Sequence, residues 1–273
     1  MSLQVNCTNI RRTLDTISAS IYANLKIYFR YKASLIVWLF STPLWILFFT
    51  TMFTLFLPES HMRTMLHQLL LSFIFLNILS ECMWATSSYL RGIKERNIME
   101  YVMMTSGGLY ISAYGSFARI LTDNLIFSTY IVVVFKLMFD IDLTILNPII
   151  FFVGLLLSYL ISYGFGLIVA SLTYRYRTIG PIINIVQFPI LILSGILLPV
   201  YSLPEEIQSI SVFIPVTYPF DLSRYGAVKG STILPLPLEF LVSILSTLLM
   251  NILGYLVLKY VEHRESIHPS SVM

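Results

Sequence analysis

The chain has 273 residues, of which 57% are apolar and only 11% charged, and its formal net charge is +3. Soluble domains carry about 25% charged residues, so this composition excludes an ordinary soluble protein and predicts an integral membrane protein. The two cysteines, Cys7 and Cys82, lie far apart in the chain and imply no disulfide framework. We therefore expect one all-α transmembrane domain over residues 1–273.

The first segment, residues 9–31, places apolar residues at steps of three and four with basic residues between them. This spacing predicts an amphipathic helix that lies in the membrane interface. The alternative is an amphipathic helix that packs on another subunit.

Six apolar runs follow, each near the length of about 20 residues that a membrane-spanning helix needs. An even number of spans places both termini on the same side. Cytoplasmic loops carry the excess of lysine and arginine, and here these residues concentrate in the two terminal segments and in the connections after the second and fourth runs. Both termini are therefore predicted to be cytoplasmic. The six runs cover residues 34–57, 68–89, 117–139, 149–172, 182–198 and 238–258.

Between the fifth and sixth runs, prolines repeatedly interrupt an apolar sequence, beginning with Pro199 and Pro204. Broken backbone is tolerated near membrane depth only where it is buried in protein or faces a watery cavity. We predict a partly re-entrant helical hairpin over residues 199–237, on the extracytoplasmic side at the mouth of a pathway. Glu205 and Glu206 are interpreted as first-turn charges of a short helix rather than as an acid/base pair.

A cytoplasmic connection follows the second run, and a short helix is predicted within residues 93–105, ended by Gly107 and Gly108. So short a helix outside the membrane is marginal by itself, so we expect it to dock into a groove of a cytoplasmic partner. A helix that lies on the protein's own surface is the alternative.

Two motifs carry a resemblance to a known family. An E-R-x-x-x-E-Y segment lies between the second and third runs, and F-P-x-x-x-x-S-G-x-x-x-P, L-P and P-x-T-Y-P-x-D-x-x-R follow from the fifth run onward. With their positions relative to the runs, these motifs resemble the permease subunit of type-2 ABC exporters, a superfamily of drug, lipid and polysaccharide exporters. The residues are Glu95, Arg96, Glu100 and Tyr101 in the first motif, and Phe188, Pro189, Ser194, Gly195, Pro199, Leu203, Pro204, Pro215, Thr217, Tyr218, Pro219, Asp221 and Arg224 in the second.

The resemblance implies a half-transporter in the cell membrane that works as a dimer with a second copy of itself or a related permease. It also implies separate ABC ATPase subunits, which grip the coupling helix through Glu95, Arg96, Glu100 and Tyr101. The chain has no GxxxxGK[ST] loop, so we expect no enzyme activity and no cofactor on it, with ATP and magnesium on the partner ATPase. Family members commonly have glycine where this chain has Asn97 and its neighbours, which predicts a more regular coupling helix here.

Polar residues within the apolar runs are the remaining candidates. Glu81 lies in the second run, where an ionised carboxylate is costly, so it either bonds to a neighbouring span or lines the pathway and senses polar or cationic substrate. Arg119 and Asp123, four residues apart, are predicted to form a structural ion pair. Small and polar residues of the fifth run serve either close helix packing or a flexible pathway-facing helix. The pathway or gate set is Glu81, Gln187, Pro189, Ser194, Gly195, Pro199, Pro204 and Tyr218.

Other classes are weaker readings of the sequence. A proton-coupled secondary transporter or channel using Glu81 is the main alternative, and a membrane scaffold or an intramembrane enzyme is a third. The four histidines lack zinc-binding spacing, and the basic residues flank spans, so neither a metal site nor a nucleic-acid partner is expected. We expect contact with membrane lipid and a hydrophobic or amphiphilic cargo that leaves the cytoplasm.

Overall fold

The computed structural model describes residues 15, 18–26, 29–30, 37, 40–41, 43–48, 50–52, 59–104, 108–175, 180–228 and 230–267. All regular structure in these residues is helical, which confirms the predicted all-α class at this level. The elements are α3 (Glu59–Glu95), α4 (Met99–Met103), α5 (Gly108–Phe139), α6 (Pro148–Arg175), α7 (Gly180–Leu193), the 3₁₀ turn η1 (Val200–Ser202), α8 (Glu205–Ser211), α9 (Thr217–Ala227) and α10 (Leu236–Ile267).

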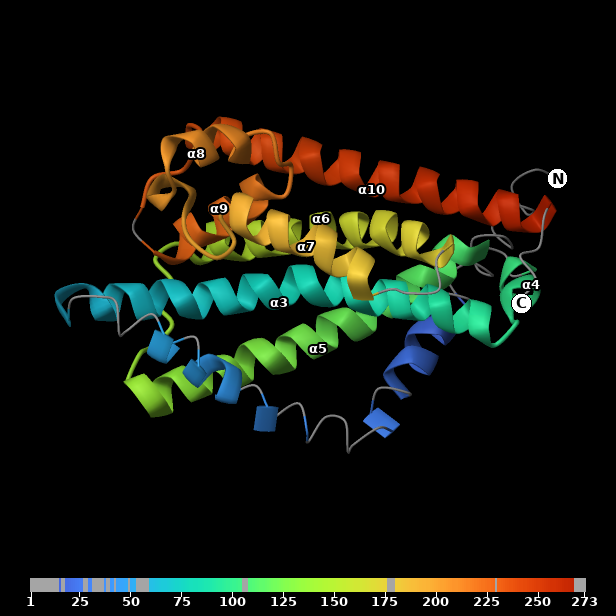
Figure 1. The fold of residues 1–273 in the computed structure, drawn as a ribbon, viewed down its shortest axis with the longest axis horizontal. Helices are drawn as coiled ribbons and strands as arrows, with labels where there is room; N and C mark the ends of the chain where they lie inside the picture. The colour runs from blue at the N-terminus through green and yellow to red at the C-terminus, as the bar shows by residue number, and fades with distance from the viewer. Residues whose placement is uncertain are drawn as a thin grey trace.

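Four long helices, α3, α5, α6 and α10, run along the length of the molecule (Figure 1). Within the described residues these are the helices long and apolar enough to cross a membrane. They coincide with four of the six predicted runs. At 1.5 Å per residue, the 37 residues of α3 extend for about 55 Å, well beyond a hydrocarbon core of about 30 Å. The ends of α3 therefore have length to spare outside the membrane.

The fifth predicted span, residues 182–198, is wrong at its end. The apolar helix α7 has 14 residues and stops at Leu193, because Gly195 adopts φ +73°. A glycine in the left-handed region two residues after the last helical residue is a frequent helix stop. A helix of this length extends about 21 Å and does not reach across the hydrocarbon core alone.

The interfacial helix predicted over residues 9–31 and the span predicted over 34–57 lie largely outside the described residues. Where the early chain is described it is helical, and the hydroxyl of Ser20 donates to the carbonyl of Ser112 on α5 at 3.1 Å. This contact joins the N-terminal segment to the bundle. Six spans therefore stay a prediction.

Helix α6 is the centre of the packing, because it contacts α3, α9 and α10. A glycine lies at each of these contacts. A Cβ added to Gly166 would lie 2.4 Å from the carbonyl oxygen of Cys82 on α3, and one added to Gly154 would lie 2.7 Å from the amide nitrogen of Ser223 on α9. At Gly164 it would meet the backbone of Asn251 on α10 at 2.8 Å. These side-chain-free positions let the helix backbones approach closely.

The short elements lie at two opposite ends of the bundle (Figure 1). Helix α4 lies at one end, beside the end of α10, and we call this the α4 end. Elements η1, α8 and α9 gather at the other, which we call the hairpin end. The proline-broken segment and the loop expected to meet an ATPase are therefore separated by the length of the bundle.

Candidate functional site

A layer of polar side chains crosses the middle of the bundle. On α3, Asn77 donates from its amide nitrogen to the amide oxygen of Asn124 on α5 at 2.8 Å, and Asn124 is fully buried. Glu81 lies one turn further along α3 and is partly buried. Each amide satisfies a polar group of the other away from water, so the pair links α3 to α5 at the level of Glu81.

The charges that act on Glu81 come from α5, where Arg119 and Asp123 both interact electrostatically with its carboxyl group. Both α5 residues are partly buried and lie one turn apart. The three titratable side chains therefore lie near one another between α3 and α5, whereas sequence spacing relates only Arg119 to Asp123. The direct Arg119–Asp123 ion pair stays a prediction.

Gln187 connects α7 to the same layer. Its amide nitrogen donates to the hydroxyl of Ser80 at 2.7 Å, and its amide oxygen accepts from the indole nitrogen of Trp84 at 3.2 Å. Both partners lie on α3, so Gln187 has satisfied its buried amide across the helix interface. Pro189, two residues on, is exposed, and α7 continues through it.

The non-helical segment after α7 is held by side chains that donate hydrogen bonds to the free carbonyl groups of the backbone. Ser211 of α8 donates to the carbonyl of Leu193, and Ser72 of α3 donates to that of Leu197 at 2.7 Å. Backbone carbonyls at a helix end lack intrahelical partners and need others when buried. Ser211 supplies a partner at the end of α7, and Ser72 supplies one to a carbonyl of the segment that follows.

Arg224 of α9 supplies the central contacts to this segment. Its guanidinium donates to the carbonyls of Gly195 at 3.1 Å and Ile196 at 2.8 Å, and it lies over the ring of Phe75 at 5.5 Å. The residue is 5% exposed, and burial lowers the pKa of Arg224 to about 10, so it is still cationic at neutral pH. A cation at the carbonyl end of α7 also complements the helix dipole. Arg224 therefore fixes the path of the chain where α7 stops.

Four of the predicted gate residues lie at the hairpin end, three in the segment after α7 and one on α9. Ser194 and Gly195 are buried in the turn after α7, and a Cβ on Gly195 would lie 2.4 Å from Val200. Pro199 is buried just before η1. Tyr218 of α9 donates from its hydroxyl to the carbonyl of Val212 at 2.6 Å, which ties α9 to the end of α8.

The start of α8 agrees with the interpretation of its glutamates. Pro204 precedes the helix directly, and Glu205 and Glu206 occupy its first turn and are exposed. The negative charges therefore face the positive end of the helix dipole, as predicted.

At the α4 end, the coupling helix differs from the prediction. Helix α3 continues to Glu95, the chain turns through Arg96 and Asn97, and α4 has five residues rather than the range 93–105. Asn97 has φ +53°, and the amide of Ile98 donates to the carbonyl of Ile93 at 3.2 Å. This is a Schellman-type stop, in which asparagine takes the place that glycine usually holds. The expected regular coupling helix is therefore wrong, because the left-handed backbone of Asn97 ends α3 before α4 begins.

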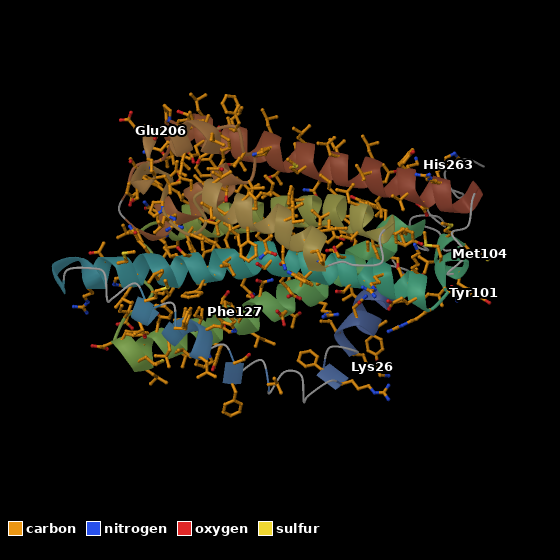
Figure 2. All side chains as sticks on the ribbon, viewed as in Figure 1. Lys26, Tyr101, Met104, Phe127, Glu206 and His263 are labelled. Atoms are coloured by element: carbon orange, nitrogen blue, oxygen red, sulfur yellow. The ribbon has the colours of Figure 1, made fainter. Side chains whose placement is uncertain are left out.

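Three of the four predicted coupling residues have described side chains at this end. Tyr101 is 72% exposed on α4, and Met104, the first residue after α4, is 83% exposed. Both project from the end of the molecule (Figure 2). Glu95 forms an ion pair with Arg91 on the surface of α3. Arg96 is exposed in the turn, and the side chain of Glu100 lies outside the described residues.

Two charged side chains attach the chain around α4 to neighbouring helices. Lys94 donates to the carbonyl of Tyr174, near the end of α6, at 3.0 Å. Glu262 of α10 accepts from the amide of Leu109, in the first turn of α5, at 3.0 Å. Each charge has the sign that the helix terminus favours. At the α4 end, these two contacts join α3 to α6 and α5 to α10.

The structure thus brings Gln187 to α3, and Glu81 to Arg119 and Asp123, and it groups the hairpin-end residues around Arg224. Sequence reasoning did not single out Asn77, Asn124, Lys94 or Glu262, and it quoted Arg224 only within a motif. The polar residues within apolar runs were a usable signal for Asn77 and Asn124. No local sequence pattern predicts the contacts of Lys94 and Glu262 with helix ends.

The comparison with protein families agrees with this organisation. The model of the ABC-2 type transporter family matches residues 16–228, more than half of the chain. The protein belongs to this family of transporter membrane proteins, as its motifs indicated.

Two curated relatives match parts of the chain. The chain is 28% identical over 98 residues to the capsule polysaccharide export inner-membrane protein BexB of Haemophilus influenzae, covering 36% of each chain. It is 27% identical over 71 residues to the capsule polysaccharide export inner-membrane protein CtrC of Neisseria meningitidis serogroup A, covering 26% of this chain and 27% of the relative. The matches therefore span about a third or less of these relatives.

Proposed function

We propose that this chain is the permease subunit of an ATP-driven exporter and forms the transport pathway with a second copy of itself or a related permease. Separate ABC ATPase subunits bind at the α4 end and carry ATP and magnesium. The observation that carries the proposal is membership of the ABC-2 type transporter family over residues 16–228. The exposed Tyr101 at the α4 end is consistent with it, because aromatic residues are enriched in protein interfaces.

In the proposed cycle, ATP binding closes the ATPases and displaces α4. Lys94 and Glu262 pass this displacement to α6 and α10, and the two permeases tilt against each other. Cargo then leaves past the hairpin end, so that the α4 end is cytoplasmic and the hairpin end extracytoplasmic. The cycle requires that ATP binds the two arrangements with different affinity, since a ligand shifts an equilibrium only by its differential affinity.

For the cargo, we propose an amphiphilic molecule with a carbohydrate portion, moved outward. An amphiphilic cargo suits a pathway built from apolar helices with one polar layer at mid-bundle. The carbohydrate portion is suggested by the names of the two relatives, which are capsule polysaccharide export proteins.

Purification from native membranes tests the proposed assembly. We expect an ABC ATPase to copurify with the chain, and the complex to hydrolyse ATP in lipid nanodiscs. A Phe213→Ala variant, which alters an exposed aromatic residue at the hairpin end, is the control and should retain the ATPase. Isolation of an active transporter without any ATPase would overturn the proposal.

A second candidate, a proton-coupled transporter, is favoured by one observation, the cluster of three titratable side chains, Glu81, Arg119 and Asp123, within the bundle. We expect Glu81→Gln to change the transport rate or cargo range while the complex and its ATP hydrolysis persist. The Gln side chain keeps the shape and removes the charge. Ser88→Ala, an exposed position two turns further along α3, is the control for transport.

The same variant separates the two candidates. If the chain belongs to an ATP-driven exporter, transport in vesicles should need ATP and should be unaffected by a pH gradient. If a pH gradient alone drives transport in the original chain and Glu81→Gln abolishes it, the proton-coupled mechanism is correct. Equal rates and equal cargo range in Glu81→Gln would show that the residue is structural.

A further inference from the structure

The hairpin end contains a cavity of about 510 Å³. Its walls come from η1, α8, the start of α9 and the chain that leads to α10. The volume falls within the range of about 300–1,000 Å³ typical of pockets for small organic ligands. It is separate from the polar layer at mid-bundle and lies beside the contact made by Arg224.

The polar groups in this cavity are acceptors and hydroxyls rather than cations. Glu205 and Asp221 contribute carboxyl groups, Gln208 an amide, and Ser209 and Thr232 hydroxyls. Among the described residues that line it, none is lysine, arginine or histidine. Such a lining favours a ligand that donates several hydrogen bonds and carries no negative charge.

Bonds to the surrounding backbone hold several of these side chains in place. Gln208 donates to the carbonyl of Leu203 at 2.7 Å, and Thr232 donates to that of Leu234 at 2.6 Å. Asp221 accepts from the amide of Ile233 at 3.1 Å. A ligand therefore meets groups that are already oriented, which lowers the entropic cost of binding.

Apolar surface completes the cavity. Tyr201 lies on its wall, with its hydroxyl accepting a hydrogen bond from Gln68 of α3 at 3.2 Å, and Val200 and Val212 line it as well. An aromatic ring beside hydrogen-bond acceptors suits a ligand with alternating hydroxyl edges and C–H faces, which is the surface of a sugar ring. Tyr201 is an amphipathic contact residue of the kind enriched in binding surfaces.

We propose that this cavity binds a neutral, hydroxyl-rich carbohydrate segment of the cargo as it leaves the pathway. The inference rests on the proposed export function and adds a binding site to it. Sugar hydroxyls donate to the carboxylates of Glu205 and Asp221 and to the amide oxygen of Gln208, and a ring face packs on Tyr201. The carboxylates disfavour anionic segments.

Cysteine protection in the full complex with its ATPase, in lipid nanodiscs, tests this site. Ser231, an exposed residue of the cavity wall, is replaced by cysteine in a Cys7→Ser background, while the buried Cys82 is kept. The measurement is the rate of labelling by a charged maleimide, with and without the neutral sugar maltotetraose. Ser202→Cys, exposed on η1 and outside the cavity lining, is the matched control.

We expect maltotetraose to slow labelling at residue 231 about tenfold when its concentration is ten times its dissociation constant, and to leave residue 202 unaffected. A tetramer of sialic acid, which is anionic, should give little protection. Absence of protection by maltotetraose, equal protection at both cysteines, or stronger protection by the anionic tetramer would each overturn the proposal. Protection by choline alone would show a cation site instead and also overturn it.

A pair of neighbouring glutamates provides the variant and its control. Glu205 lines the cavity, whereas Glu206 does not and projects from the outer edge of the bundle (Figure 2). Charge-assisted hydrogen bonds are roughly twice as strong as neutral ones. Glu205→Gln should therefore raise the dissociation constant for maltotetraose, measured by protection of residue 231, about five- to tenfold. Glu206→Gln removes an equal charge from the same helix turn and should change nothing. Equal effects of the two variants would contradict the site.

The outcome for the cavity is independent of the outcome for the exporter. If the ATPase copurifies and hydrolyses ATP but no protection is seen, the cavity proposal is wrong and the exporter stands. If no ATPase copurifies, the export function itself is wrong.

Discussion

Arg224→Met is expected to destabilise the protein by about 2–5 kcal/mol, because it leaves the buried carbonyls of Gly195 and Ile196 without their donor. Methionine fills most of the volume but cannot donate a hydrogen bond. The measurement is thermal unfolding in detergent, where we expect a midpoint lower by several degrees. Transport should fall as well, because the segment between α7 and η1 loses its fixed path.

Two further variants isolate the cause. Arg224→Lys keeps the charge but only one donor group, so it should recover part of the stability. Arg63→Met removes an exposed arginine near the start of α3 and should leave the unfolding midpoint nearly unchanged. If Arg224→Met is as stable as Arg63→Met, the guanidinium does not support the carbonyls.

Tyr101→Ala is expected to weaken binding of the ATPase about 30-fold or more, because a central aromatic anchor of an interface contributes about 2 kcal/mol or more. The tyrosine is 72% exposed on α4. Binding is measured by titrating the purified ATPase onto the permease in nanodiscs, and coupling by cargo-stimulated ATP hydrolysis. The unfolding midpoint of the permease alone should not change.

One control away from α4 and one further variant on α4 test this interface. Phe213→Ala removes a similarly large aromatic ring, 85% exposed between α8 and α9 at the hairpin end, and should bind ATPase normally. Glu100→Arg reverses a charge on α4 and should uncouple hydrolysis from transport. Normal binding and normal transport in both α4 variants would show that the ATPase docks elsewhere.

The sequence predicted the four long helices well, because an apolar run of membrane length has few alternatives to a helix. It predicted the start of α8 from Pro204 and its glutamates for a local reason too, since helix capping depends on adjacent residues. The residues at which α7 and α3 end were harder to predict from the sequence. Gly195 and Asn97 both adopt positive φ, and a single residue in that region cannot be inferred from hydropathy or propensity.

The site residues divide in the same way. Glu81 was found because a carboxylate within an apolar run is conspicuous, but its neighbours Arg119 and Asp123 lie on another helix. Arg224 lies far along the chain from Ser72, which contacts the same segment, so their shared role depends on tertiary packing. Contacts between residues distant in the sequence are the part that one sequence could not supply.

The glycines of α6 restrict how this protein can move. Gly154, Gly164 and Gly166 meet the backbones of three different helices at distances that leave no room for a Cβ. A slide of α6 by one residue along its axis would bring side chains to these three places at once, and packed interfaces resist such continuous deformation. The α3, α6, α9 and α10 assembly is therefore expected to turn as one rigid lever, with any change of shape confined to its periphery.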